Sequence, residues 1–374
     1  MKPRLILLCK SPPELLTPVF SIALALARRM RVCLVTTACA FSAREALEQA
    51  GVEVVTTGGI EGSGFFARAT RARGFRRKAC EFLFAQQKDP SGIRLWVGSG
   101  DTAVLLGPEL LRAEPFVLQL HELYDTNPVY LHLLGPLARR AVSVVVPESN
   151  RADIVRCWYQ LDRAPLVIPN KPWYHPRTRC LAVHAPGAKS VLDALAGRKI
   201  VLYQGDIGPL RDIRPIAKAV GNMGSRWAFL AMGRDRHGFV PAIRAQAPNT
   251  IHIGHLGAPT HLEITSHAHI GVAVYGFDML NAVFCAPNKI WEYSGFGIPI
   301  LCQDLPGLRS TVGAAQAGLC LDTTNPAQVE RAIETIDDAY PDMSANASHF
   351  FESVDIEELA LQALGLGTPV ERQT

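Results

Sequence analysis

The feature that most constrains the fold is an alternation that runs along the chain. Short apolar runs rich in β-branched residues take turns with longer segments whose apolar residues recur at helical spacing. This pattern is typical of βαβ units, in which helices connect parallel strands. The first half predicts strands at 4–9, 31–36, 52–56, 93–97, 115–120, 142–146 and 165–168, with the clearest helices at 18–29 and 149–159.

The alternation is interrupted once and then resumes. Residues 169–197 contain four prolines and lack periodic apolar residues, which indicates a domain boundary. Further strands are predicted at 199–204, 226–231, 250–253, 269–274 and 298–302. We therefore predict an α/β protein with two Rossmann-like, doubly wound parallel-sheet domains facing a cleft. The expected divisions are an N-terminal domain (1–170), a linker (171–197), a second domain (198–345) and a C-terminal helix and tail (346–374).

Composition narrows the class of protein. Of 374 residues, 48% are hydrophobic and 19% charged, which excludes a disordered chain. The net charge of +4 is too small to indicate nucleic-acid binding, and its basic excess lies in residues 1–170, which carry 21 Lys and Arg against 15 Asp and Glu. The nine cysteines never form a Cys-x-x-Cys pair, and no apolar run is long enough for a signal peptide or membrane span. We expect a cytoplasmic protein.

The most informative stretch is APNKIWEYSGFGIPIL at 286–301. Pro287 suits the start of a helix, whose free N–H groups can hold a phosphate, and Lys289 adds a positive charge beside them. Glu292 lies about one helical turn beyond Asn288, where its carboxylate could accept hydrogen bonds from ribose hydroxyls. A solvent-facing helix that carries Lys and Glu would explain the same spacing.

This stretch closely resembles the Pro-Asn-Lys, aromatic, Glu-Tyr, Gly-x-Pro signature of GT-B glycosyltransferases. The resemblance is to the large retaining family of bacterial mannosyl- and glucosyltransferases, known as glycosyltransferase family 4. Other segments resemble further parts of that family in the same order along the chain. They are QLHELYDT (119–126), the segment 144–172, KIVLYQGDIGPLRDIRPIAKAV (199–220), the segment 250–275 and GLCLD (318–322).

The resemblance implies a function and a set of site residues. It implies transfer of a sugar, with retention of configuration, from a nucleoside-diphosphate sugar bound by the second domain to a glycan or lipid-linked acceptor bound by the first. It implies UDP or GDP as the nucleotide and neither a metal ion nor another cofactor. The implied catalytic residues are His121, facing the donor sugar, and Arg211, neutralising the leaving diphosphate. The implied donor-binding residues lie at three places. Gly205, Asn288 and Lys289 would lie near the diphosphate or sugar, and Glu292 would contact the ribose. Arg214 is a further implied donor-binding residue.

Two departures from the family pattern keep other functions open. Many members have a second glutamate eight positions before the one that matches Glu292, but Phe284 stands there. The arginine that follows the family's glycine is Asp206 here, so the cationic role would fall to Arg211 or Arg214. A nucleotide-sugar-binding protein that has lost turnover, or a GT-B sugar-nucleotide epimerase, therefore remains an alternative.

Three other patterns have weaker functional interpretations. The string HIGH at 252–255 matches a nucleotidyltransferase signature, but it lies deep in the second half. His261, His267 and His269 could suggest zinc, although no Cys or carboxylate recurs at ligand spacing. Gly98 and Gly100 weakly resemble a phosphate loop, but a strand-to-helix turn capped by Asp101 explains them as well.

Residues 67–84 combine basic and aromatic side chains. Such a segment is typical of a membrane-surface or anionic-acceptor site, and a solvated helix face is the plain alternative. The residues expected to form this surface are Arg73, Arg76, Arg77 and Lys78, among the aromatic side chains of Phe65, Phe66, Phe75, Phe82 and Phe84. We therefore expect polysaccharide biosynthesis, possible peripheral attachment to the inner face of the plasma membrane, and no nucleic-acid partner.

Overall fold

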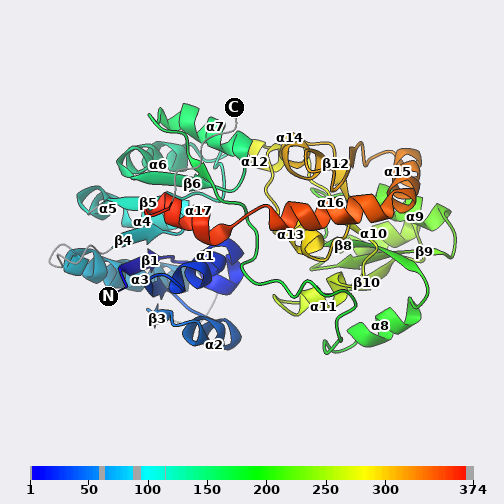
Figure 1. Ribbon diagram of the computed structural model, residues 1–374, viewed down its shortest axis with the longest axis horizontal. Coiled ribbons are helices and arrows are strands. Elements are labelled where there is room, and N and C mark those ends of the chain that lie inside the picture. The colour runs from blue at the N-terminus through cyan, green and yellow to red at the C-terminus, as the bar shows by residue number, and fades with distance from the viewer. Residues whose placement is uncertain (1, 59–63, 87–93, 114, 368–374) are drawn as a thin grey trace. The chain divides into compact units, whose positions relative to one another are not determined.

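The computed structural model describes residues 2–58, 64–86, 94–113 and 115–367. The chain forms two compact units, with boundaries between Trp173 and Tyr174 and between Val354 and Asp355. Each unit is built around one parallel sheet (Figure 1).

The sheet of the first unit has strand order β3-β2-β1-β4-β5-β6-β7, and every neighbouring pair is parallel. Its strands are β1 (Arg4–Leu8), β2 (Arg31–Thr36), β3 (Glu53–Thr56), β4 (Arg94–Val97), β5 (Phe116–Gln119), β6 (Ser143–Val146) and β7 (Leu166–Val167). Its α-helices are α1 (Thr17–Ala27), α2 (Phe41–Gln49), α3 (Phe65–Gln86), α4 (Gly100–Leu106), α5 (Pro108–Arg112), α6 (Pro128–Arg140), α7 (Ser149–Tyr159) and α17 (Ile356–Ala363).

The sheet of the second unit has order β10-β9-β8-β11-β12-β13 and is also parallel throughout. Its strands are β8 (Lys199–Gln204), β9 (Trp227–Met232), β10 (Ile251–Ile253), β11 (Ile270–Ala273), β12 (Ile300–Gln303) and β13 (Gly318–Leu321). Its α-helices are α8 (Ala188–Ala194), α9 (Arg214–Asn222), α10 (Val240–Gln246), α11 (His261–Thr265), α12 (Leu280–Val283), α13 (Asn288–Gly295), α14 (Pro306–Leu308), α15 (Pro326–Asp338) and α16 (Tyr340–Glu352).

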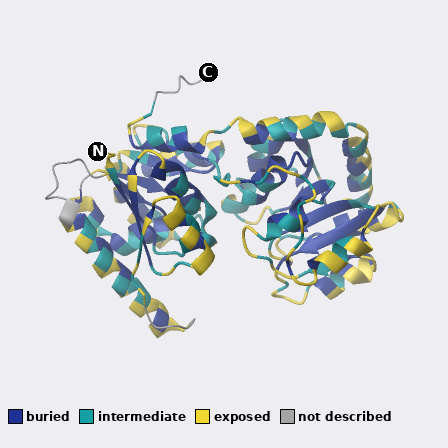
Figure 2. Ribbon diagram, turned by 60° about the horizontal axis from the view of Figure 1, so that its bottom comes forward, coloured by how far each residue is buried: buried dark blue, intermediate teal, exposed yellow. Residues whose placement is uncertain are grey.

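Both sheets confirm the predicted doubly wound α/β class. In each, the strand order reverses beside the first strand of the unit, between β1 and β4 and between β8 and β11. Ligands of open α/β sheets bind outside the carboxyl ends of the strands at such a reversal. The central strands are apolar on both faces because helices cover both, and Figure 2 shows them as dark blue, buried ribbon.

The division of the chain differs from the predicted one at two places. Residues 174–197 belong to the second unit, since Leu181, Val183 and Ala185 pack in its core and Arg179 donates to the carbonyl of Ser266. The predicted single tail helix is two helices that belong to different units. α16 packs on α13, whereas α17 packs on α1 of the first unit.

Two local predictions were wrong, one on a strand and one on a helix cap. Strand β13 was not expected, because GLCL is short and only partly buried. Ser99, not Asp101, caps α4, and its hydroxyl accepts from the N–H of Thr102 at 3.1 Å. The strand predicted at 250–253 is confirmed: His252 lies in edge strand β10, so the string HIGH does not follow the first strand of its sheet, as its position in the second half indicated.

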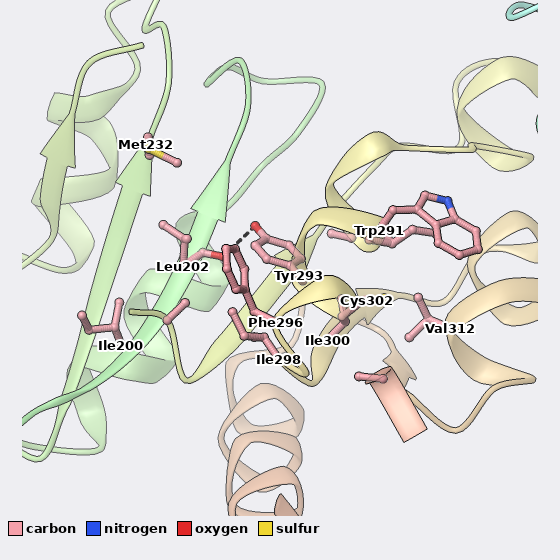
Figure 3. Packing of buried hydrophobic residues seen from close by; sticks show 14 of the residues in the cluster. Ile200, Leu202, Met232, Trp291, Tyr293, Phe296, Ile298, Ile300, Cys302 and Val312 are labelled. Atoms are coloured by element: carbon pink, nitrogen blue, oxygen red, sulfur yellow. Dashed lines mark hydrogen bonds between the residues drawn. The ribbon is translucent and has the colours of Figure 1, made fainter. Parts of the chain in front are cut away.

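The core of the second unit packs α13 against the sheet. The buried side chains of α13 pack against those of β8 and β12 (Figure 3). Tyr293 is fully buried, and its hydroxyl donates to the carbonyl of Leu202 at 3.1 Å. On the outer side of α13, Trp291 stacks on Phe350 of α16 with ring centres 4.2 Å apart. These contacts fix α13 relative to the end of β8.

All nine cysteines are free thiols. In the part of the chain that the structure describes, no helix is long and apolar enough to cross a membrane.

Candidate functional site

The residues that follow β8 come together with those of α13 at the reversal of the second sheet. Gly205 has φ +135°, and a Cβ there would lie 3.1 Å from Nζ of Lys289 and 3.5 Å from Nη1 of Arg211. Its own N–H donates to the carbonyl of Met232 at 2.9 Å. Gly205 therefore leaves room beside the two cations but does not offer a free N–H.

The next strand end also requires a glycine. Gly233, which follows β9, has φ +154°, and a Cβ there would lie 1.8 Å from the carbonyl oxygen of Gly205. The two glycine backbones therefore pack directly on each other. A side chain at Gly233 would therefore push Gly205 away from β9.

Lys289 and Arg211 form a pair of cations beside two tyrosines. Nζ of Lys289 lies 4.4 Å from the ring centre of Tyr203 and 5.4 Å from that of Tyr275, and the Arg211 guanidinium lies 5.0 Å from the Tyr275 ring. Burial, and then the charge of Arg211, lower the pKa of Lys289 from 10.5 to about 7. Among the described residues, Nζ of Lys289 has no hydrogen-bond partner and neither cation forms an ion pair with a carboxylate. An anion beside both side chains would accept from Nζ of Lys289 and favour its charged form.

Glu292 is part of a hydrogen-bonded network. Its Oε1 lies 3.2 Å from Nε2 of His261, and its Oε2 accepts from the side-chain amide of Gln204. The amide oxygen of Gln204 in turn accepts from the hydroxyl of Thr265 at 2.7 Å. A carboxylate has about four lone-pair positions, so Glu292 keeps acceptor capacity for a ligand's hydroxyls.

The network holds Glu292 ionised. Burial acts to raise the pKa of Glu292, but His261 and Lys289 lower it overall. Burial likewise acts to lower the pKa of His261, but Glu292 raises it overall. The two side chains therefore favour an ion pair, and the side chain that would contact ribose is a charged acceptor.

His175 supports α13 from the segment that the sequence predicted as a linker. Its Nδ1 accepts from the N–H of Arg177 at 3.1 Å, so its Nε2, 3.0 Å from the carbonyl of Glu292, is the donor. Burial lowers the pKa of His175 to about 4, which keeps the ring neutral in this role. His175 therefore steadies the backbone of Glu292.

Two further residues were expected at the donor site, Asn288 and Arg214. Asn288 is the first residue of α13, directly before Lys289. Arg214 begins α9, where its guanidinium forms an ion pair with Asp212 at 2.7 Å and lies 5.0 Å from the ring centre of Phe239. The structure therefore groups Gly205, Lys289, Arg211 and Glu292 but leaves Arg214 engaged elsewhere.

His121 follows β5 in the first unit and is buried. Its Nε2 lies 2.8 Å from the carbonyl of Gly98, so this nitrogen carries the proton and donates. Burial lowers the pKa of His121 to about 4, and the guanidinium of Arg151, which donates to the carbonyl of His121, acts in the same direction. Glu122 is exposed, as expected for adjacent residues on an extended chain. The imidazole is thus a neutral group in a fixed orientation.

The basic segment is α3 of the first unit. Arg76 pairs with Glu109 of α5 at 2.7 Å, and Lys78 pairs with Glu81 at 2.7 Å, while Arg73 and Arg77 are exposed. The aromatic residues divide into two groups. Phe75 is fully buried in the core and cannot belong to a surface, whereas Phe65, Phe66 and Phe84 are exposed.

The three histidines considered as zinc ligands have separate partners. His261 pairs with Glu292, His267 bonds the carbonyl of Leu181 at 2.9 Å, and His269 bonds Asp337 at 2.8 Å. Among the described residues, no group of three or more His, Cys, Asp or Glu side chains is arranged to hold a metal ion.

No family model and no curated protein matches the sequence. Solved structures do match. Anabaena HepE, solved with UDP and glucose, is 16% identical with a TM-score of 0.68, over 97% of this chain and 98% of HepE. Sucrose-phosphate synthase from Thermosynechococcus elongatus is also 16% identical with a TM-score of 0.68, over 96% and 97%. WaaG, a glycosyltransferase involved in lipopolysaccharide biosynthesis, is 13% identical with a TM-score of 0.62, over 98% and 99%.

These matches span nearly the whole of both chains, and this chain has two doubly wound units, one after the other. The chain has the GT-B fold. The resemblance read from residues 286–301 is therefore confirmed at the level of the fold, and Gly205, Lys289 and Glu292 all lie in the second unit.

Several residues of this candidate site were not found from the sequence. Gln204, Tyr203 and Tyr275 carry no motif, since each is only the last polar or aromatic residue at the end of an apolar strand. His261 was weighed only as a metal ligand, and its partner Glu292 is 31 positions away. A signal was available for Tyr203 and Gln204, because residues at the carboxyl ends of strands beside a reversal line the ligand site.

Proposed function

We propose that this chain is a glycosyltransferase that moves a sugar from a nucleoside-diphosphate sugar to a glycan or lipid-linked acceptor. The observation that carries the proposal is the pair of basic side chains beside Gly205, buried Lys289 and half-buried Arg211, neither of which forms an ion pair with a carboxylate in the part of the chain that the structure describes. A departing nucleoside diphosphate gains negative charge in the transition state, and preorganised cations stabilise that charge. Arg211 and Lys289 are the catalytic cations of this proposal.

The donor is proposed to be a UDP- or GDP-hexose. UDP is the first choice because the similar protein HepE was solved with UDP and with UDP-glucose. Glu292 accepts hydrogen bonds from the ribose, held in place by His261 and Gln204. Asn288, next to Lys289, lies near the diphosphate or sugar. The two side-chain cations supply the charge at the diphosphate, so the proposal includes no metal ion or other cofactor, and the sugar is transferred with retention.

The acceptor is proposed to bind the first unit. His121, neutral and held by the carbonyl of Gly98, orients the sugar and does not act as a charged imidazolium acid. Large apolar side chains are exposed on segments that follow β1, β2 and β3, which end at the same sheet edge. They are Leu15 (73% exposed), Phe41 (82%), Phe65 (73%) and Phe66 (84%). These side chains and the basic residues of α3 favour a lipid-linked acceptor and work at the cytoplasmic membrane surface, as in polysaccharide biosynthesis.

A nucleotide-sugar-binding protein without turnover is the second candidate. Asp206 replaces a cation directly after Gly205 and lies 3.7 Å from Arg236, and Arg214 is held by Asp212. Phe284 stands where many relatives have a glutamate. The site therefore has fewer charged groups for a diphosphate than the family pattern implies.

Two measurements on the purified chain separate these candidates. A thermal-shift screen of UDP-, GDP-, ADP- and dTDP-sugars should stabilise the chain with one base, by about 2.7 kcal/mol at a hundred times the dissociation constant. Stabilisation should be lost in Lys289→Gln and kept in Lys218→Gln, since Lys218 is exposed on α9. No stabilisation by any of these donors would refute both candidates.

Release of nucleoside diphosphate from the bound donor then decides between them. Slow release by hydrolysis, abolished in Arg211→Ala, supports an enzyme. Binding without any release, with or without candidate acceptors, supports the binding protein.

A further inference from the structure

The second unit has a cavity at the amino ends of its strands, whereas Gly205 lies at their carboxyl ends. It encloses about 400 Å³ and lies at the amino ends of β8, β9 and β10, between α9 and α10. Nucleotides of open α/β sheets bind at the carboxyl ends. The cavity is therefore separate from the proposed donor site, and its volume is within the range of small-molecule sites, about 300–1,000 Å³.

The walls of the cavity are partly apolar and include two aromatic side chains. Trp227 and Phe229 are two residues apart on β9, so their side chains point to the same face of the sheet. Ala217 of α9 and Ala247, the residue directly after α10, complete the wall, and all four residues are buried. These small side chains leave room for a flat apolar body against the aromatic rings.

The polar groups of the cavity favour an anion. Arg198 is the only charged residue in the lining, which contains no carboxylate. Its Nε donates to the carbonyl of Ser225 at 2.9 Å and its Nη2 to that of Trp227, which fixes the guanidinium and uses two of its five N–H donors. The remaining donors can bind a carboxylate.

The cavity also contains an unsatisfied hydroxyl. Thr250 lines it, is 5% exposed, and its Oγ1 has no hydrogen-bond partner among the described residues. A buried hydroxyl without a partner is unfavourable, and rotation of the Thr250 side chain toward a ligand oxygen in the cavity would satisfy it. Apolar walls with few convergent polar groups are typical of ligand sites.

We propose that this cavity binds a small aromatic carboxylate, with the ring against Trp227 and Phe229 and the polar groups at Arg198 and Thr250. The inference is independent of the proposed glycosyl transfer, since it uses none of the residues of the donor site. No covalent step is involved.

Benzoate is the probe, with benzylamine as the matched compound of opposite charge. Calorimetry and saturation-transfer NMR on the full chain should detect benzoate at one site per chain at millimolar concentrations, with UDP present or absent. Benzylamine should not bind. No binding of benzoate, equal binding of benzylamine, or displacement of benzoate by UDP would overturn the proposal.

Variants then test the residues. Ala247→Leu fills the cavity and should abolish binding. Thr250→Val keeps the shape of the side chain and should weaken binding by about tenfold, as should Arg198→Met. Arg226→Met is the control, because Arg226 is exposed beside Trp227 but does not line the cavity. Circular dichroism checks the fold of each variant. Unchanged affinity in both Ala247→Leu and Thr250→Val would overturn the assignment.

Discussion

Nucleotide binding should take up a proton at Lys289. The unliganded site lowers the pKa of this lysine from 10.5 to about 7, first through burial and then through Arg211. At about 1.4 kcal/mol for each pKa unit, holding the ammonium charged there costs the unliganded protein about 5 kcal/mol. A diphosphate beside Nζ offsets this cost, because it provides both the missing hydrogen-bond partner and the opposite charge.

The sign of the pH dependence follows from these states. Between about pH 7 and pH 10 the unliganded folded protein binds fewer protons at Lys289 than either the unfolded chain or the nucleotide complex. The free energy of unfolding of the unliganded protein should therefore rise with pH across this window. UDP affinity should fall, by about tenfold from pH 8 to pH 9, with uptake of about one proton.

Calorimetry in buffers of different ionisation enthalpy measures that proton uptake directly. Lys289→Gln should remove the uptake and the pH dependence, weaken UDP binding by at least about tenfold, and leave the unliganded protein more stable at neutral pH. Lys218→Gln, an exposed change on α9, should behave as the unmodified chain does. Affinity that is flat over this pH range, or proton uptake that persists in Lys289→Gln, would refute the reasoning.

Three further predictions concern other parts of the molecule. Glu292→Gln should weaken nucleoside-diphosphate binding in calorimetry without unfolding the chain, because the amide keeps the shape of the side chain but is not a charged acceptor. Unchanged affinity would show that Glu292 does not bind the ribose. Arg211→Ala should lower turnover more than it lowers donor affinity. Arg214→Ala should change turnover and affinity by less than about threefold, because Asp212 already holds that guanidinium near the surface. A larger loss in Arg214→Ala than in Arg211→Ala would reverse the assignment. In a flotation assay the chain should bind anionic vesicles at low salt and be released at high salt. Binding should disappear in a variant in which four basic residues of α3 are neutralised. Equal flotation of the unmodified chain and this variant would mean that α3 is only a solvated face. The four residues are Arg73, Arg76, Arg77 and Lys78.

The sequence determined the class of fold and one half of the site. Alternation of apolar runs and helical periods is sufficient to predict two parallel sheets, because each buried strand and each amphipathic helix has its own local pattern. The helix that begins at Asn288 was also predictable, since Pro287 precedes it, and so was the placement of Lys289 and Glu292 on it. These features depend on residues close together in the chain.

Only the tertiary structure decided which distant residues complete the site and what they do there. Both Arg211 and Arg214 were candidates for the cationic role in sequence, and only the fold brings Arg211 to Lys289, whereas Arg214 pairs with its near neighbour Asp212. The low pKa of Lys289 and the pairing of Glu292 with His261 come from burial and from contacts between separate strands and helices. Such contacts have no local pattern, because the side chains meet only when the sheet places the ends of its strands side by side.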